Sequence, residues 1–474
     1  MRLMKWAGKE GLACLLLVLT GVGYALPAKA QDLTEVLTRT YETNPALAAA
    51  RSGLFATAEQ LPQARAGYLP VISVLGTEGR NRIKQRTKDT NNLGSITQGL
   101  NTTTTDRSLE LDLTLNLYQG GQTMAATSAA EANVASSLAQ LNSTEQQILL
   151  NATTAYAAIG LYQSLTQMAD ESRHELELLK AWANEMYAHQ LITITYVADV
   201  DAQLAAAEAN SAAVRGQLRS AKSQCMAITG MQLDDIEQWP RLPSPPASKD
   251  EAISMAMKNN PSIQQAEFAL QANTEEVQRL EGTLLPSVDA YSQTKRSWNK
   301  SRFTGAQDYK EHATEDTWTF GVNVTMPIFQ GGLHYAQVRG AKQAFVQSQH
   351  QLVDARRTIL AQVEEQWEAL EAAKAQERSS AEMVKAANLS FDGYKHQLKN
   401  GTSTMQDVLN AHAQLISAKT AQEQAGHDAF VATANLLAAI GVFNARQLDL
   451  PVPQFDTQGY ISRVRYRWVG TGIE

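Results

Sequence analysis

The sequence predicts a mainly α-helical protein with membrane β-strands, built from two internal repeats. Three observations support this fold class. The chain of 474 residues contains two Asn-Pro motifs in similar contexts, Asn44-Pro45 and Asn260-Pro261. A leucine occupies every second position of residues 109–117. Each repeat also contains about 66 consecutive residues with coiled-coil-like patterning, which at 1.5 Å per residue gives roughly 100 Å of helix.

The first thirty residues have the features of a secretory signal peptide. Basic residues precede an apolar run, and the run is followed by an A-x-A cleavage pattern formed by Ala28 and Ala30. The alternative is a membrane anchor, which needs about 20 apolar residues, and this run is shorter. We therefore expect residues 1–30 to be removed on export.

The composition excludes several classes of protein. Without the signal segment, which has four bases and one acid, the formal net charge falls from −7 to −10, so nucleic-acid binding is disfavoured. Cys225 is then the single cysteine, which excludes an intrachain disulfide. The histidines form no H-E-x-x-H or His/Cys cluster. We expect no catalytic residue, no metal site and no cofactor, and a protein that is not an enzyme.

The motifs divide the chain into a first repeat, a linker, a second repeat and a tail. The linker is rich in proline, and the tail has no functional interpretation. The boundaries are 31–230 for the first repeat, 231–247 for the linker, 248–443 for the second repeat and 444–474 for the tail.

Each repeat is predicted to contain a helix, a strand, a polar loop, a second strand, a long helix, a turn and a last helix. Each Asn-Pro motif should break or kink the first helix. The two polar loops are expected at 80–107 and 295–316. The predicted helices cover 33–66, 121–187, 197–229, 249–283, 332–397 and 404–442, and the predicted strands cover 69–79, 108–118, 286–294 and 317–329.

The leucine strand has two different faces, because Glu110 and Asp112 alternate with the leucines. Its counterpart at 317–329 alternates apolar residues with small or polar ones such as Asn323. Each strand alone fits the surface of a soluble sheet. It also fits a membrane barrel with leucines toward lipid and polar groups toward a wet lumen. Four strands cannot close a barrel, but three chains sharing twelve strands can.

The order of these motifs resembles the TolC family. Both strand pairs end in Y/F-Q-G-G, at 118–121 and 329–332, and residues 401–422, GTSTMQDVLNAHAQLISAKTAQ, are also similar. The resemblance covers about residues 32–443. It implies a homotrimer in the outer membrane of a Gram-negative bacterium, with a twelve-stranded barrel continued by an α-helical periplasmic tunnel. Its implied role is that of a passive exit duct for type I protein secretion or multidrug efflux.

The resemblance also implies partners. These are a periplasmic adaptor, an inner-membrane transporter of the ABC or RND type, and outer-membrane lipid. It does not name the cargo, although the Y/F-Q-G-G junctions resemble the protein-secretion branch by analogy. The main alternative is a periplasmic coiled-coil structural or adaptor protein without a pore. That alternative explains the helices but not four alternating strands at equivalent places. A third possibility, a secreted hydrolase, would need a cluster of polar catalytic residues, and the sequence contains no such motif.

The turns between the long helices and the helices that follow them are implied to form the periplasmic entrance of the channel. Asp407 matches the entrance aspartate of the second repeat, and Asp199 that of the first. Six acids per trimer at a narrow mouth would favour cations. The structural alternative for Asp407 is a capping box with Thr404.

The two tip turns differ from each other and from the family pattern. In our alignment Gly401 of the second tip corresponds to Thr193 of the first. Ser403 and Asn410 also depart from the family pattern, which leaves open how the entrance is latched. His189 and His396, aligned beside the turns, are either a pH-sensitive pair or ordinary surface residues.

Glycine pairs mark the strand-to-helix junctions, Gly120-Gly121 in the first repeat and Gly331-Gly332 in the second. They allow either a swivel between barrel and tunnel or simply a turn that needs glycine, and the second explanation is favoured. Four aromatic side chains near strand ends fit either a membrane-interface girdle or ordinary packing. They are Tyr68, Tyr291, Trp318 and Phe320.

Overall fold

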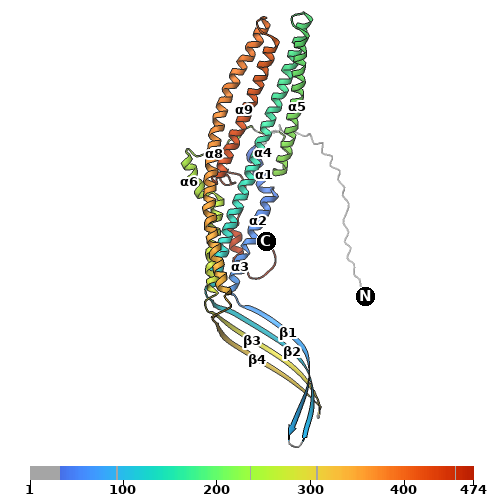
Figure 1. Ribbon diagram of the computed structural model, residues 1–474, viewed down its shortest axis with the longest axis vertical. Coiled ribbons are helices and arrows are strands. Elements are labelled where there is room, and N and C mark those ends of the chain that lie inside the picture. The colour runs from blue at the N-terminus through green and yellow to red at the C-terminus, as the bar shows by residue number, and fades with distance from the viewer. Residues whose placement is uncertain are drawn as a thin grey trace, which may run out of the picture.

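The computed structural model describes residues 32–91, 94–234, 236, 238–305, 308–453 and 455–473. The expected signal peptide, with Ala28 and Ala30, lies outside these residues. The strands form a sheet at one end of the molecule, and two long helical hairpins extend to the opposite end (Figure 1). The predicted fold class is therefore confirmed for the chain: it is mainly helical, and each repeat contributes two antiparallel strands.

The two repeats have corresponding elements in the same order. The first contains α1 (Leu33–Thr43), α2 (Pro45–Ala58), α3 (Gln60–Arg65), η1 (Ala66–Tyr68), β1 (Val71–Asn91), β2 (Gly94–Gln119), α4 (Gln122–Ala188) and α5 (Ile194–Thr229). The second contains α6 (Lys249–Asn259), α7 (Pro261–Gly282), β3 (Ser287–Thr304), β4 (Tyr309–Thr325), α8 (Leu333–Lys399) and α9 (Met405–Ala439), and α10 (Thr457–Val464) follows in the tail.

The Asn-Pro motifs break the first helix of each repeat, as predicted. Asn44 caps α2 by accepting from the Ala46 and Leu47 amides at 2.9 and 3.2 Å. Asn260 caps α7 by accepting from the Ser262 amide at 2.9 Å. Proline at the first helical position fits because its missing N–H would have no helical partner.

Each capping asparagine also joins the beginning of its repeat to the end. The Asn44 side-chain amide donates to the Ile228 carbonyl at the end of α5, at 2.9 Å. The Asn260 amide donates to the Ala439 carbonyl at the end of α9, also at 2.9 Å. Each motif therefore both starts a helix and fixes the returning arm of the helical hairpin.

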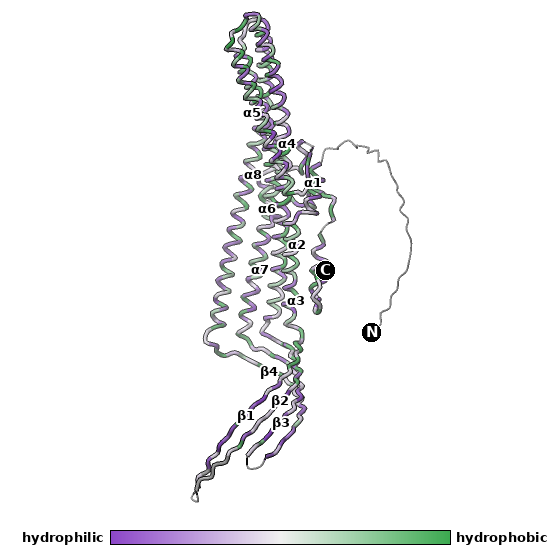
Figure 2. The backbone as a smooth tube through the Cα atoms, turned by 90° about the vertical axis from the view of Figure 1, so that its right-hand side faces the viewer, coloured by the Kyte–Doolittle hydropathy of each residue, from purple (hydrophilic) through white to green (hydrophobic). Residues whose placement is uncertain are grey.

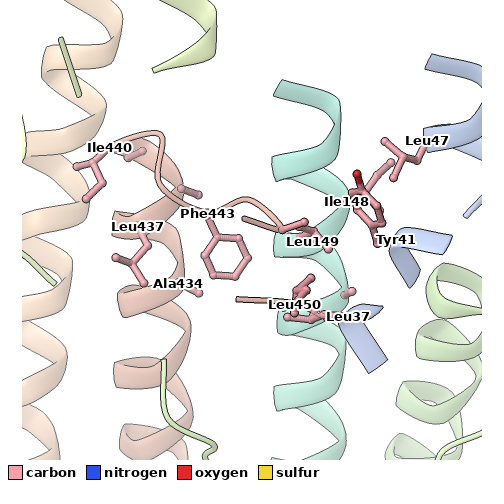
Figure 3. Close-up of a cluster of buried hydrophobic side chains, with 14 of the residues drawn as sticks. Leu37, Tyr41, Leu47, Ile148, Leu149, Ala434, Leu437, Ile440, Phe443 and Leu450 are labelled. Carbon is pink, nitrogen blue, oxygen red and sulfur yellow. The ribbon is translucent and has the colours of Figure 1, made fainter. Parts of the chain in front are cut away.

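The long helices α4 and α8 have 67 residues each, close to the predicted bounds. Polar and apolar residues are mixed along their length (Figure 2). Helix α4 packs against α5, α7 and α9, and α8 packs against α7 and α9. A large apolar core lies midway along the helices, where Phe443 sits between Leu437 of α9 and Leu149 of α4 (Figure 3). All three side chains are almost completely buried.

The sheet has the antiparallel order β1-β2-β3-β4 and is longer than predicted. The predicted loops at 80–107 and 295–316 are wrong, because most of these residues continue the strands. The prediction relied on hydrophobic alternation, and here both faces carry polar side chains. The backbone ladder nevertheless satisfies the N–H and C=O groups, and β-branched threonines favour extended chain. Strand β4 ends at Thr325, before Pro327, which has no N–H for the ladder.

The tail forms a helix and no strand in the described residues. It packs α10 against α2, with the Phe55 ring 3.8 Å from the Tyr460 ring and 5.3 Å from the Phe455 ring. Arg465 forms an ion pair with Glu131 of α4. The tail is therefore a packing element on the outside of the first repeat.

Candidate functional site: the two sheet faces and the helical tips

The register of the sheet assigns each side chain to one of two faces, because successive side chains point to opposite sides. We call the side that carries Leu109, Leu111 and Leu113 the leucine face, and the opposite side the carboxylate face. Near the helices all four strands contribute apolar side chains to the leucine face, and Ser292 and Thr294 of β3 lie among them. Its apolar members there are Ile72, Val74, Leu111, Leu113, Val288, Ala290, Trp318, Phe320, Val322 and Val324.

Among the described residues, no other element covers this apolar part of the leucine face. Phe320 is 72% exposed, Trp318 71% and Leu111 46%. The rings of Trp318 and Phe320 lie 5.5 Å apart on this face. A contiguous exposed apolar patch of this kind indicates contact with a partner or with lipid.

The carboxylate face brings Glu110, Asp112 and Asn323 to one side of the sheet. The Gln293 side-chain amide donates to Glu110 at 2.5 Å and to Asp112 at 3.0 Å. Lys295 Nζ lies 3.3 Å from Glu110 Oε2, and the Glu110 side chain is only 14% exposed. Along β3 the side chains of this face are mostly less exposed than their neighbours on the leucine face. Crowding on one side indicates that the carboxylate face is the concave one.

The junction glycines have left-handed backbone conformations in both repeats. Gly120 and Gly331 have φ of 60° and 63°, and Gly121 and Gly332 have φ of 81° and 84°. Other residues are strained in this conformation. Gly120 is also confined, since an added Cβ would lie 2.3 Å from the Gly282 carbonyl oxygen. The turn geometry is thus sufficient to explain why glycine stands at these positions.

The tip turns require a correction to our alignment of the repeats. Helices α4 and α8 end at Ala188 and Lys399, and the next helices are capped by Thr193 and Thr404. Both pairs differ by 211 positions, whereas the pairing of Gly401 with Thr193 assumes an offset of 208. The same structural register pairs Gly401, at φ 73°, with Gln190, at φ 61°. Gly401 therefore does not correspond to Thr193.

The corrected register also separates the two candidate entrance acids. Asp199 corresponds to Asn410, and Asp407 corresponds to Tyr196. Asp407 is three residues after its cap and Asp199 is six after its own, a difference of roughly 4.5 Å along a helix. The same shift shows that His189 corresponds to Asn400, so the expected pairing of His189 with His396 is wrong. The Y/F-Q-G-G motifs also differ by 211 positions, and since α4 and α8 are equally long, extending that offset without a gap gives the corrected register.

Asp407 is held in a capping box. Its Oδ2 accepts from the Thr404 hydroxyl at 2.6 Å and the Thr404 amide at 2.9 Å, and the Ser403 hydroxyl donates to it at 3.1 Å. These hydrogen bonds lower the pKa of Asp407 below its usual range, with the Thr404 hydroxyl contributing most. The capping box with Thr404, which the sequence offers as the structural role of Asp407, is therefore confirmed. Asp199 is exposed on α5.

Beneath the tips, α4, α5, α8 and α9 share a second apolar cluster that the sequence did not reveal. His412 of α9 is buried beside it, with its ring 5.4 Å from the Phe391 ring. Burial lowers the pKa of His412, and the nearby Glu175–Lys395 ion pair acts in both directions. The apolar spacing of the α9 sequence around His412 was the signal that could have identified it.

Within the described residues, no group of three or more histidine, cysteine, aspartate or glutamate side chains is arranged to hold a metal ion. In the same part of the chain, no helix combines the length and the apolar character that a membrane crossing requires.

The architecture defines a class of protein in which each repeat joins two strands to one long helical hairpin. The outer membrane efflux protein family matches this chain over residues 36–231 and 252–442, and the chain belongs to that family. The similarity to TolC is thereby confirmed. The chain is 28% identical to the outer membrane efflux protein BepC of Brucella suis, over 98% of this chain and 97% of BepC.

Two further comparisons agree with this assignment. The chain is 24% identical to the outer membrane protein TolC of Escherichia coli, over 92% of this chain and 87% of TolC. Its fold matches the crystal structure of the outer membrane protein VceC from Vibrio cholerae with a TM-score of 0.71 at 18% identity. That match covers 86% of this chain and 96% of VceC.

Proposed function

We propose that this protein is the outer-membrane exit duct of a tripartite export system. Three copies share one barrel of twelve strands, with the leucine face toward lipid and the carboxylate face toward a water-filled lumen. The helical hairpins continue the lumen as a periplasmic tunnel whose tips form the entrance. The duct is passive, and an inner-membrane transporter and a periplasmic adaptor supply energy and connection.

The observation that carries this proposal is the division of the sheet into one exposed apolar face and one polar, concave face. The sheet has open edges at β1 and β4, and open edges are not tolerated in lipid. Pairing of β4 with β1 of another copy removes both edges. Four strands cannot close alone, and twelve leave a lumen too wide for side chains to fill.

The positions of the two acids at the tips give a more detailed proposal for the entrance. In a trimer, Asp407 and Asp199 form two rings of three acids at different levels, and not one ring of six. Asp407 is engaged by its own cap through three hydrogen bonds. Asp199 is exposed, so its charge is available to passing ions. We therefore assign cation attraction mainly to Asp199 and tip rigidity mainly to Asp407.

The test is planar-bilayer conductance of the detergent-extracted protein under a salt gradient. A small, cation-selective conductance is expected. Asp199→Asn should reduce the preference for cations. The control is Asp201→Asn, because Asp201 is a neighbouring exposed acid whose charge is already paired with Lys180 at 2.7 Å. Protein that extracts without detergent and forms no channel would refute the duct and favour a periplasmic coiled-coil protein.

For the cargo and the partner transporter, the proposal names only a class. Type I protein secretion and multidrug efflux both fit a wide passive duct, and the transporter selects the cargo. Co-purification of the trimer with adaptors of each class, expressed one at a time, would discriminate between them. Binding to neither would contradict the tripartite assembly.

A further inference from the structure

Beyond the apolar region, the outer half of the sheet separates charge by face. On β1 the leucine face continues with Arg80, Arg82, Lys84 and Arg86 at alternate positions. The strand is hydrophilic along this half (Figure 2). On the carboxylate face at the same level, Asp106, Glu311 and Glu315 are present and no base accompanies them. The two faces of one sheet therefore carry opposite charge.

The leucine face changes character in steps along the strands. At the level of Leu109, Arg296 pairs with Asp316 at 2.5 Å. One step further, Arg107 pairs with Glu78 at 2.8 Å, and Trp298 lies beside Arg107 on β3. These two rows are therefore neutral overall. A tryptophan between apolar and charged surface is typical of a membrane interface.

The next two rows contain bases without acids. Arg80 and Lys300 lie in the first, with His312, and Arg82, Arg302 and Lys310 lie in the second. We call Arg80, Arg82, Lys300, Arg302 and Lys310 the basic collar. All five are exposed, and among the described residues none has a carboxylate within ion-pair distance.

The position of the basic collar corresponds to a lipid headgroup zone. Four residues beyond Leu109 give roughly 14 Å along a strand, or roughly 10 Å along the membrane normal at a tilt of about 40°. In a trimer the collar supplies fifteen cations around the barrel. Arginine and lysine at this density match phosphate groups, to which arginine donates bidentate hydrogen bonds.

We propose that the basic collar binds the phosphate groups of an anionic, phosphorylated lipid in the outer leaflet. This inference rests on the proposed insertion of the leucine face into the outer membrane. The lipid neutralises the collar and fixes the depth of the barrel. The opposite charge on the carboxylate face keeps such lipids outside the lumen.

The test is a titration of detergent-extracted, full-length protein with fluorescent, bis-phosphorylated lipid A. The phosphate-free form of the same lipid should bind at least about tenfold more weakly. The variant Arg82→Gln, Lys300→Gln, Arg302→Gln should lose at least about tenfold in affinity for the phosphorylated form. The control Arg219→Gln, Arg357→Gln, Arg378→Gln removes equal charge from exposed helix positions and should bind like the wild type.

Several outcomes would overturn the proposal. They are equal binding of both lipids, full binding by the collar variant, an equal loss in the control, or displacement by millimolar inorganic phosphate. If the triple variant does not assemble, Arg82→Gln and Lys300→Gln alone should each lose about threefold. Conductance of the collar variant should be unchanged. If the wild-type protein shows no conductance, the proposed channel is refuted. The lipid titration tests the basic collar separately, because it does not depend on conductance.

Discussion

The strand-to-helix junction offers four glycine positions at which strain and steric contact can be separated. Gly120 combines a left-handed φ with a contact of 2.3 Å between an added Cβ and the Gly282 oxygen. Gly121 and Gly331 have the left-handed φ and open space. Gly282 of α7 has helical backbone, but its Cβ would lie 2.6 Å from the Gly120 oxygen.

The expected magnitudes follow from these differences. Gly121→Ala and Gly331→Ala should each cost about 1 kcal/mol, the lower end of the left-handed penalty. Gly282→Ala should cost about 2 kcal/mol from overpacking against backbone that has little room to move. Gly120→Ala combines both effects and should cost about 3 kcal/mol or more.

The assay is thermal loss of helical circular dichroism for the four variants in one detergent, with the yield of assembled protein as a second measurement. We expect Gly120→Ala to have the lowest transition temperature, Gly282→Ala an intermediate one, and the other two to lie close to the wild type. Equal shifts for Gly120→Ala and Gly121→Ala would refute the steric argument. They would mean that the turn relaxes and that backbone conformation alone determines the cost.

Three further predictions concern the helices. Asn260→Ala should lower the free energy of unfolding by about 1–3 kcal/mol, because it removes a buried pair of hydrogen bonds. Asn44 is half-buried, so Asn44→Ala should cost less, and equal melting temperatures of the two variants would contradict this. Thr404→Ala should cost about 1 kcal/mol through loss of the cap, with Thr404→Ser near neutral, as measured by hydrogen exchange of the first turn of α9; unchanged exchange would exclude the capping role. His412 has a pKa lowered by burial, so stability is full above the unfolded value of about 6.5 and is lost as pH falls below it. The amide protection factors of the tip region, corrected for the intrinsic pH dependence of exchange, should fall at pH 5 in the wild type and less in His412→Gln, and an identical fall would exclude His412 as the cause.

The sequence predicted elements whose signal is local and repeated. Alternating leucines identified β2, and duplicate Asn-Pro and Y/F-Q-G-G motifs identified the repeats and the junctions. The outer halves of the strands were not predicted, because their alternation is between basic and neutral polar residues, and a hydrophobic criterion does not detect it. That alternation, from Arg80 to Lys88, was nevertheless present in the sequence.

The candidate entrance was predicted less well than the sheet. Asp407 and Asp199 do lie at the two tips, but a difference of three residues in repeat alignment made them appear equivalent. Both turns have a left-handed residue at the same structural position, Gln190 and Gly401, and only one of these is glycine. The tip cluster around His412 depends on side chains from four helices that are distant in the chain. No local pattern specifies such a contact.

The asparagine contacts described above fix one end of each helical hairpin, and side-chain packing joins the two hairpins near the other end. Asn44 holds the end of α5 and Asn260 holds the end of α9, while α4, α5, α8 and α9 share the apolar cluster beneath the tips. From the Ile228 and Ala439 contacts to the tips is roughly 50 Å along either helix. Over that length a rotation of about 10° at the asparagine moves the tip by roughly 9 Å, so such a rotation has to separate the apolar cluster that the two hairpins share. The asparagine contacts and the tip cluster therefore determine together how far apart the two tips lie.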